Sequence, residues 1–463
     1  MTDLYHRVSE LLRTKTALKT AIALISAVAV YFFLPESCPE AARRVAFIFV
    51  FAAMFWALEI IPLYATSMLV VLMSIFMLTR PGGILDMDRT GYQQFLVPFA
   101  SPVIILFFGG FVLATALHKY GIDRLIAQRL MRVFGKRPFW VMVGLMGTTA
   151  FLSMWMSNTA TAAMMIVMVR PLYEQLDKDD PFRVSLVLSI PFGANIGGIG
   201  TPVGTPPNAI ALGILAQHDV HINFVKWMMM AVPLAIILLA VTAAVLFYMF
   251  RPKHHEVHLE IAQVAHMGYR AKLVMAIGVF TVLLWLTSEF HKIPEALVGL
   301  LAAGMYAASG LLNKDDFKNI DWDVLILMWG GLALGLAMGI SGLSDWIVSL
   351  PIFDRTGFLL FVIACVLAVF MSTVMSNTAT ATLLIPIVII LPGGDPVMLA
   401  ITVALSCSFA MALPVSTPPN AIAFASNIIR SQDMFRAGTL ISIVSLIVLL
   451  MGYNYILPLI FGF

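Results

Sequence analysis

The string SMWMSNTAT at residues 153–161 decides the fold of this chain, because it returns as STVMSNTAT at residues 372–380. A second string, PVGTPPNAIA at 202–211, recurs as PVSTPPNAIA at 414–423, with nine of ten positions identical. Both strings keep their order in the two halves of the chain. This shared order indicates that a whole structural unit is present twice.

The composition restricts the class of protein. Only 11% of the 463 residues are charged, 60% are hydrophobic, and the mean hydropathy is +0.95. Soluble globular chains carry roughly a quarter of charged residues, so this chain has too few polar groups to cover a water-soluble body of its size. A soluble enzyme and a disordered chain are therefore excluded. The net charge of +3, without a basic stripe, argues against nucleic acid as a partner. We expect an all-α polytopic membrane protein surrounded by lipid.

Apolar segments long enough to cross a bilayer give the number of spans, because a membrane helix needs about 20 apolar residues. Eleven crossings are predicted. They lie at 18–35, 43–61, 62–79, 99–118, 184–216, 227–250, 272–289, 294–312, 322–340, 396–429 and 437–460.

Two further apolar segments, 138–170 and 356–394, contain the SNT strings near their middle. We predict that each is a re-entrant hairpin that begins and ends on the same side of the membrane. Five crossings then separate the two SNT strings, and an odd number inverts the second copy relative to the first. This is the inverted-topology repeat of many secondary transporters, which bind their ligands near the bilayer midplane. A weaker repeated pair, FFGGF at 107–111 and MWGGL at 328–332, agrees with the duplication.

The distribution of basic residues predicts the orientation, since positively charged loops stay in the cytoplasm. With the N-terminus inside, the cytoplasmic loops and termini hold 21 of the 28 Lys and Arg residues. We therefore expect a multi-pass membrane protein with a cytoplasmic N-terminus and an external C-terminus.

The repeated strings suit a ligand site inside the membrane. The double prolines at 206–207 and 418–419 must break their helices, and broken helices at membrane depth are tolerated where they line a cavity. The SxxxSN spacing predicts that Ser153 and Ser157 lie one turn apart on one helical face, as do Ser372 and Ser376. Neutral oxygens suit a hard monovalent cation, and amide donors at helix N-termini suit an anion.

The absence of charge in these stretches indicates which ion is coupled. Residues 138–169, 184–218, 356–394 and 396–429 contain no Asp, Glu, Lys or Arg, and only His218 could titrate. Proton-coupled carriers generally need a titratable relay within the membrane. We therefore expect coupling to sodium, and a bound sodium ion would also supply the positive charge for an anionic substrate.

At these residues the chain resembles the divalent anion/sodium symporter family, whose bacterial members include dicarboxylate transporters. The resemblance covers essentially the full length. It implies a protein of the plasma membrane, the bacterial inner membrane, and two or more coupling sodium ions. It implies sodium sites built from Ser153, Ser157, Asn158 and the backbone near Gly204, and from Ser372, Ser376, Asn377 and the backbone near Ser416. It implies that the substrate carboxylates meet Asn158, Thr159, Asn377 and Thr378, with Thr205, Pro206, Thr417 and Pro418 on the opposite wall.

The resemblance also implies an elevator mechanism, in which a transport domain moves against a scaffold domain that forms a homodimer. The scaffold would comprise residues 1–135 and 251–353, and the transport domain residues 136–250 and 354–463. Two amphipathic arms, 121–134 and 341–353, would join them. In the first arm, Ile122, Leu125, Ile126, Leu130 and Val133 are predicted to form the apolar side.

The predicted function is sodium-coupled symport of C4-dicarboxylates such as succinate, malate or fumarate. A dicarboxylate exchanger, or a carrier of tricarboxylates or sulfate, remains as an alternative. An intramembrane enzyme is disfavoured because the central segments offer no nucleophile beside a buried acid or histidine, and a channel is a further alternative. His254, His255, His258 and His266 are expected to lie in a solvated loop.

Overall fold

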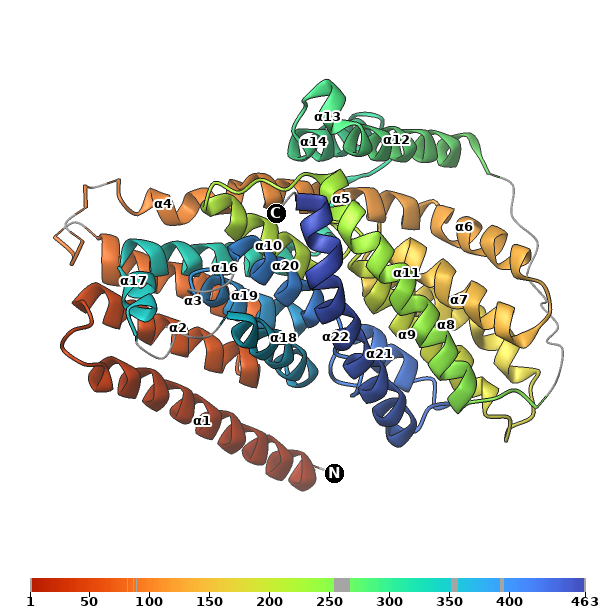
Figure 1. Cartoon of the computed structure of the whole chain (residues 1–463), viewed down its shortest axis with the longest axis horizontal. Helices are drawn as coiled ribbons and strands as arrows, with labels where there is room; N and C mark the ends of the chain where they lie inside the picture. The colour runs from red at the N-terminus through yellow and green to blue at the C-terminus, as the bar shows by residue number, and fades with distance from the viewer. Residues whose placement is uncertain are drawn as a thin grey trace.

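The computed structural model describes residues 2–80, 82–85, 87–88, 90–253, 267–350, 357–391 and 395–461. In these ranges every regular element is a helix (Figure 1). The expected all-α membrane fold is confirmed. The histidine-rich loop at 254–266 and the first residue of the second hairpin, 356, lie outside the described residues.

Seven helices of the described chain are long and apolar enough to cross a membrane. They are α1 (Thr2–Phe33), α2 (Glu40–Leu58), α5 (Pro102–Lys119), α11 (Phe224–Met249), α12 (Tyr269–Leu286), α16 (Trp322–Ile340) and α22 (Ser431–Phe461). The short helices α4 (Gln93–Leu96) and η2 (Val97–Ala100) lead into α5.

The other four predicted spans are shorter or broken. Helix α3 (Leu63–Ser74) continues into the π-helical turn η1 (Ile75–Thr79), and α14 (Glu295–Ala308) ends before Gly310, which has a φ of +65°. The span predicted at 184–216 consists of α9 (Phe182–Gly198) and α10 (Pro206–Gln217). The span predicted at 396–429 consists of α20 (Pro396–Cys407) and α21 (Pro418–Phe424). Each second half begins at a double proline, because proline is tolerated only in the first turn of a helix.

The two SNT segments form helix pairs that break at the polar string. Helix α7 (Pro138–Ser153) is followed by α8 (Asn158–Glu174), and α18 (Gly357–Val374) is followed by α19 (Asn377–Val388). The helices of each pair also pack against one another. Each helix has fewer residues than the roughly 20 that a full crossing needs, as a re-entrant hairpin requires.

Short helices connect the long ones. They are α6 (Ile122–Met131), η3 (Arg132–Phe134), α13 (Ser288–His291), α15 (Lys314–Lys318) and α17 (Leu343–Val348). Helix α6 is the first predicted arm, and α17 lies within the second, of which 351–353 are outside the described residues. Val133 of the predicted apolar side is 78% exposed, whereas Ile122 and Leu125 are buried. The chain leaves α-helical periodicity at η3, which turns Val133 outward.

Glycine allows α5 and α14 to approach closely. A Cβ atom at Gly109 of α5 would lie 2.4 Å from Cα of Gly299 on α14, so only a residue without a side chain fits there. Small residues at such crossings are typical of packed membrane helices. This crossing joins the first half of the chain to the second.

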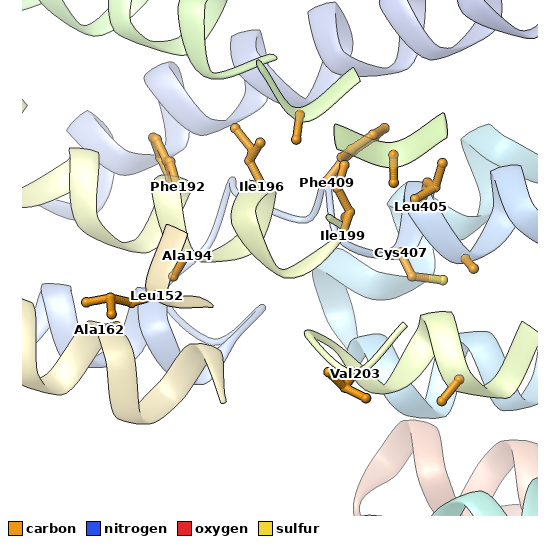
Figure 2. Packing of buried hydrophobic residues seen from close by; sticks show 14 of the residues in the cluster. Leu152, Ala162, Phe192, Ala194, Ile196, Ile199, Val203, Leu405, Cys407 and Phe409 are labelled. Carbon is orange, nitrogen blue, oxygen red and sulfur yellow. The ribbon is translucent and has the colours of Figure 1, made fainter. Parts of the chain in front are cut away.

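The broken helices of the two halves interlock in the core. Helix α21 packs on α8 and α9, while α10 packs on α19 and α20. In Figure 2, Phe192 and Ile196 lie on one side of α9, whereas Ala194 lies on the side toward Leu152 of α7. Both sides of α9 are thus buried, and this fixes the position of the loop that follows it.

An aromatic stack connects the first hairpin to α12. The rings of Trp155 and Phe224 are 6.1 Å apart and nearly parallel, and those of Phe224 and Trp285 are 5.2 Å apart and nearly parallel. Phe224 and Trp285 are fully buried. The stack runs from the break between α7 and α8, through the start of α11, to the end of α12.

Candidate functional site

A cavity of about 370 Å³ lies where the four helix breaks meet. Both copies of each repeated string contribute to its wall. Twelve of the fourteen predicted site residues line it: Ser157, Asn158, Thr159, Gly204, Thr205, Pro206, Ser376, Asn377, Thr378, Ser416, Thr417 and Pro418. Residues that are more than 200 positions apart in the sequence therefore share one site.

The other two predicted residues, Ser153 and Ser372, lie directly behind this wall and are fully buried. The Oγ atom of Ser153 donates a hydrogen bond to Oδ1 of Asn158 over 2.5 Å and is 2.9 Å from the carbonyl oxygen of Ala194. Ser372 binds Oδ1 of Asn377 in the same way. Each half of the cavity thus has a serine and an asparagine oxygen close enough to contact one cation.

The predicted common helical face of Ser153 and Ser157 is wrong, and so is that of Ser372 and Ser376. Helix α7 ends at Ser153, and Ser157 is the N-cap of the next helix, whose Oγ accepts a hydrogen bond from the amide of Ala160 over 3.2 Å. Ser376 caps α19 in the same way. The reason is that a serine before Asn-Thr is a favourable N-cap, which starts a new helix instead of continuing the old one.

Three helices of at least twelve residues therefore begin at the cavity: α8 at Asn158, α10 at Pro206 and α19 at Asn377. A helix N-terminus carries a partial positive charge and unpaired amide donors. Among the described residues, no lysine or arginine lines the cavity. Attraction for an anion in this part of the site must therefore come from helix ends, hydroxyl groups, side-chain amides and any cation bound nearby.

Two asparagines of the TPPN strings hold the loops at the breaks. Nδ2 of Asn208 donates to the carbonyl oxygens of Gly198 at 3.0 Å and Thr201 at 2.8 Å. Nδ2 of Asn420 donates to the carbonyl oxygen of Leu413 at 3.0 Å, the position equivalent to Thr201. Sequence reasoning left these residues out of the site, although their presence in both copies was the available signal.

Glycines set the distance between the loop after α9 and the first SNT string. A Cβ atom at Gly198 would lie 2.6 Å from Oδ1 of Asn158, and one at Gly204 would lie 2.5 Å from the carbonyl oxygen of Gly198. In the second copy, Ser416 replaces Gly204 and its Oγ donates to the carbonyl oxygen of Thr373 over 2.9 Å. The two halves of the site are therefore similar but not identical.

Another part of the cavity wall comes from helices outside the SNT and TPP strings. They contribute Pro62, Leu63, Tyr64, Phe107, Phe111, Asp321, Asp323, Val324 and Leu327. Sequence reasoning missed this wall because only Phe107 and Phe111 belong to a repeated string, the weaker FFGGF pair. It includes two carboxylates, although the four charge-free stretches themselves contribute none.

Asp321 and Asp323 stand at the start of α16, on the rim of the cavity. Both side chains are exposed, yet protein atoms crowd Asp321 so that desolvation, together with the neighbouring charge of Asp323, raises the pKa of its carboxyl group. The rim therefore has a negative charge that depends on pH.

The cavity continues into a hollow of about 630 Å³ that shares Ser157, Thr159 and Asp321 with it. The outer lining of this hollow includes His118, Lys119, Asp316 and Asn319. Lys119 is engaged there, since its Nζ atom is 2.5 Å from a carboxylate oxygen of Asp316. The site thus opens toward the connection between α14 and α16.

Comparison with known proteins identifies the family of the chain. A model of the citrate transporter family matches residues 53–392. The sodium-dependent dicarboxylate transporter SdcS of Staphylococcus aureus strain MRSA252 is 32% identical, over 93% of this chain and 89% of SdcS. The chain belongs to the divalent anion/sodium symporter family.

A further relative of this chain is an uncharacterized transporter of Haemophilus influenzae, which is 34% identical over 94% of this chain and 97% of its own length. Among solved structures, the YdaH transporter of Alcanivorax borkumensis matches with a TM-score of 0.54 and 13% identity, over 86% of this chain and 98% of that chain. The similarity to the YdaH structure concerns the fold alone. The protein is thus a multi-pass membrane transporter of the bacterial plasma membrane.

Proposed function

We propose that the protein is a secondary active transporter that brings C4-dicarboxylates such as succinate, malate or fumarate across the membrane together with sodium. The observation that carries this proposal is the cavity shared by both SNT strings and both TPP strings. The name of the Staphylococcus aureus relative supports the substrate class and the coupling ion.

The proposed sodium sites are the two serine–asparagine pairs with the backbone near Gly204 and Ser416. Sodium prefers neutral oxygen ligands of this kind, and helix ends at the site favour an anion. Asn158, Thr159, Asn377 and Thr378 would contact the substrate carboxylates, opposite Thr205, Pro206, Thr417 and Pro418. Two or more sodium ions lower the electrostatic cost of burying the dianion, so binding of the ions and of the substrate is mutually favourable.

We propose an elevator mechanism with residues 136–250 and 354–463 as the moving part and residues 1–135 and 251–353 as the scaffold of a homodimer. The wall formed by α3, α5 and α16 belongs to the scaffold, and the opposite wall belongs to the moving part. With a cytoplasmic N-terminus, the connection between α14 and α16 is cytoplasmic. The structure then corresponds to a state that is open to the cytoplasm.

A second candidate is a tricarboxylate carrier, which the match to the citrate transporter model favours. Exchange of internal for external dicarboxylate is a further candidate. Both use the same cavity, so direct measurement of substrate and ion dependence separates them.

The deciding experiment is uptake of labelled succinate into proteoliposomes. We expect accumulation with an inward sodium gradient and none when potassium replaces sodium. Excess citrate should compete weakly. Uptake that requires internal succinate and not sodium would establish exchange, and uptake of citrate in preference to succinate would establish the tricarboxylate carrier. If the protein takes up neither succinate nor citrate, the proposal is overturned.

Two variants test the proposed site. Asn158→Ala and Asn377→Ala should each abolish sodium-dependent uptake while the protein still inserts and remains stable in detergent. Asn223→Ala is the control, because Asn223 caps α11 away from the cavity. Wild-type kinetics in either of the first two variants would remove that residue from the site.

A further inference from the structure

Asn195 links the first half of the chain to the second at the cavity wall. It lies on α9, lines the cavity and is 1% exposed. Its Nδ2 atom is 3.3 Å from Oγ1 of Thr417 and 3.4 Å from Oδ1 of Asn420, both of which belong to the second TPPN string. These distances lie at the long end of the hydrogen-bond range, and both acceptors face the same amide group.

The hydroxyl group of Thr417 receives a second hydrogen bond. As the N-cap of α21, its Oγ1 atom accepts from the backbone amide of Asn420 over 3.3 Å. A hydroxyl oxygen has two acceptor sites and one proton to donate. Asn195 and Asn420 use both acceptor sites of the Thr417 hydroxyl group, so this group can still act only as a donor. Thr417 lines the cavity, where a ligand could accept its proton.

The first half of the chain has no such link. Counted from the TPP strings, Asn195 corresponds to Cys407; counted from the serine hydrogen bonds, which pair Ala194 with Cys407, it corresponds to Ser408. Neither residue has a side-chain amide to donate, and the hydroxyl group of Thr205 caps no amide of α10. Among the described residues, Oδ1 of Asn208 accepts no hydrogen bond, whereas Oδ1 of its counterpart Asn420 accepts one from Asn195. The two threonines of the TPP strings are therefore oriented by different means.

We propose that Asn195 is a positioning residue that orients the O–H group of Thr417 toward a carboxylate of the substrate. This proposal rests on the proposed dicarboxylate function and deepens it. A hydroxyl group held as a donor recognises a carboxylate oxygen, while a hydroxyl group free to rotate does so less well. The two carboxylates of the substrate consequently meet unequal halves of the site.

The test compares variants in proteoliposomes at saturating sodium. Asn195→Cys removes the amide donor and should raise the KM for succinate about 3- to 10-fold, as the loss of one hydrogen bond does. The sodium concentration for half-maximal uptake should change less than about twofold, since Asn195 is outside both proposed sodium sites. Asn195→Asp keeps the shape but converts the donor into an acceptor for the Thr417 proton, and should raise the KM further.

A double-mutant cycle separates positioning from a general structural effect. Thr417→Val should raise the KM by itself, and Asn195→Cys should add less than about twofold in that background, because its route through Thr417 is already lost. Thr417→Ser, which keeps the hydroxyl group, should retain the response to Asn195→Cys. Melting temperatures in detergent identify any variant that fails to fold, and the cycle then uses Asn195→Asp instead.

Additive effects in the cycle would overturn the proposal, as would a change of sodium dependence without a change of KM for succinate. Failure of the proposed function is a different result, namely no sodium-dependent succinate uptake by the wild-type protein.

Discussion

The Oγ atom of Ser372 lies 2.8 Å from Oδ1 of Asn377, five residues later in the chain and across a helix break. The same oxygen of Ser372 is 2.8 Å from the carbonyl oxygen of Cys407 on α20. Three oxygens from three helices are thus gathered at one point behind the cavity wall. The first half of the chain repeats this arrangement with Ser153, Asn158 and Ala194.

Removal of one serine hydroxyl group at either point should weaken sodium binding. Ser153→Ala and Ser372→Ala each lose an oxygen that would contact the ion, and we expect the sodium concentration for half-maximal uptake to rise at least about tenfold, as for a bond to a charged group. Sodium titration of succinate uptake measures this. Ser189→Ala is the matched control, because that buried hydroxyl group binds its own helix. An unchanged sodium dependence in both variants would exclude the serines as ligands.

A methyl group at Gly198 should impair the first half of the site by displacing Asn158. Its Cβ atom would lie 2.6 Å from Oδ1 of Asn158, so the asparagine side chain must shift. We expect Gly198→Ala to lower sodium-dependent uptake by about tenfold or more. Gly147→Ala on α7, where a Cβ atom meets no neighbour within 4 Å, should behave like the wild-type protein. Equal activity of the two variants would contradict this geometry.

The crossing of α5 and α14 should be more sensitive to substitution on one side than on the other. A Cβ atom at Gly109 would lie 2.4 Å from Cα of Gly299, whereas one at Gly299 would lie 3.3 Å from Cα of Gly109. Gly109→Ala should destabilise the protein by about 1–3 kcal/mol, as overpacking does, and Gly299→Ala by less. Melting temperatures in detergent measure the difference. Gly304→Ala, on the same helix with open space around it, should have no effect.

Asp321 should make stability depend on pH in a predictable direction. Desolvation by the protein atoms that crowd it, together with the charge of Asp323, raises the pKa of its carboxyl group, so its ionisation disfavours the folded protein. The protonated carboxyl group is the form that the folded protein favours. Its contribution to stability is complete below the ordinary carboxyl pKa of about 4 and is lost as the pH rises through the raised pKa. Asp321→Asn should therefore melt at the same temperature as the wild-type protein near pH 4 and at a higher temperature at neutral pH. The exposed Glu36→Gln is the control, and a difference that does not vary with pH would contradict this account.

The repeated strings allowed most of the fold and the inner wall of the site to be predicted. The double prolines at 206–207 and 418–419 mark local breaks that depend only on backbone chemistry, and the structure has breaks there. The span predicted at 322–340 coincides with α16, because its apolar run is bounded by charged residues at the start. These features are local, so a single sequence contains them.

The rest of the site depends on contacts between distant segments. Asp321 and Tyr64 reach the cavity only because α16 packs against α3, and no periodicity in either segment indicates this. Asn195 occurs once, with Cys407 or Ser408 at the equivalent position, so a search for duplicated asparagines passes over it. The misplacement of Ser157 has a local cause: the same residue type serves in a helix interior and as an N-cap, and spacing alone does not separate the two.

The stack of Trp155, Phe224 and Trp285 gives the protein an internal optical marker. Trp155 and Phe224 belong to the proposed moving part, and Trp285 belongs to the proposed scaffold. A sliding displacement between the two parts would separate the ring of Trp285 from that of Phe224 and change the surroundings of an indole that is fully buried in the present state. In a variant whose other tryptophans are replaced by phenylalanine, the intrinsic fluorescence of Trp285 would then report each movement of the transport domain without an attached label.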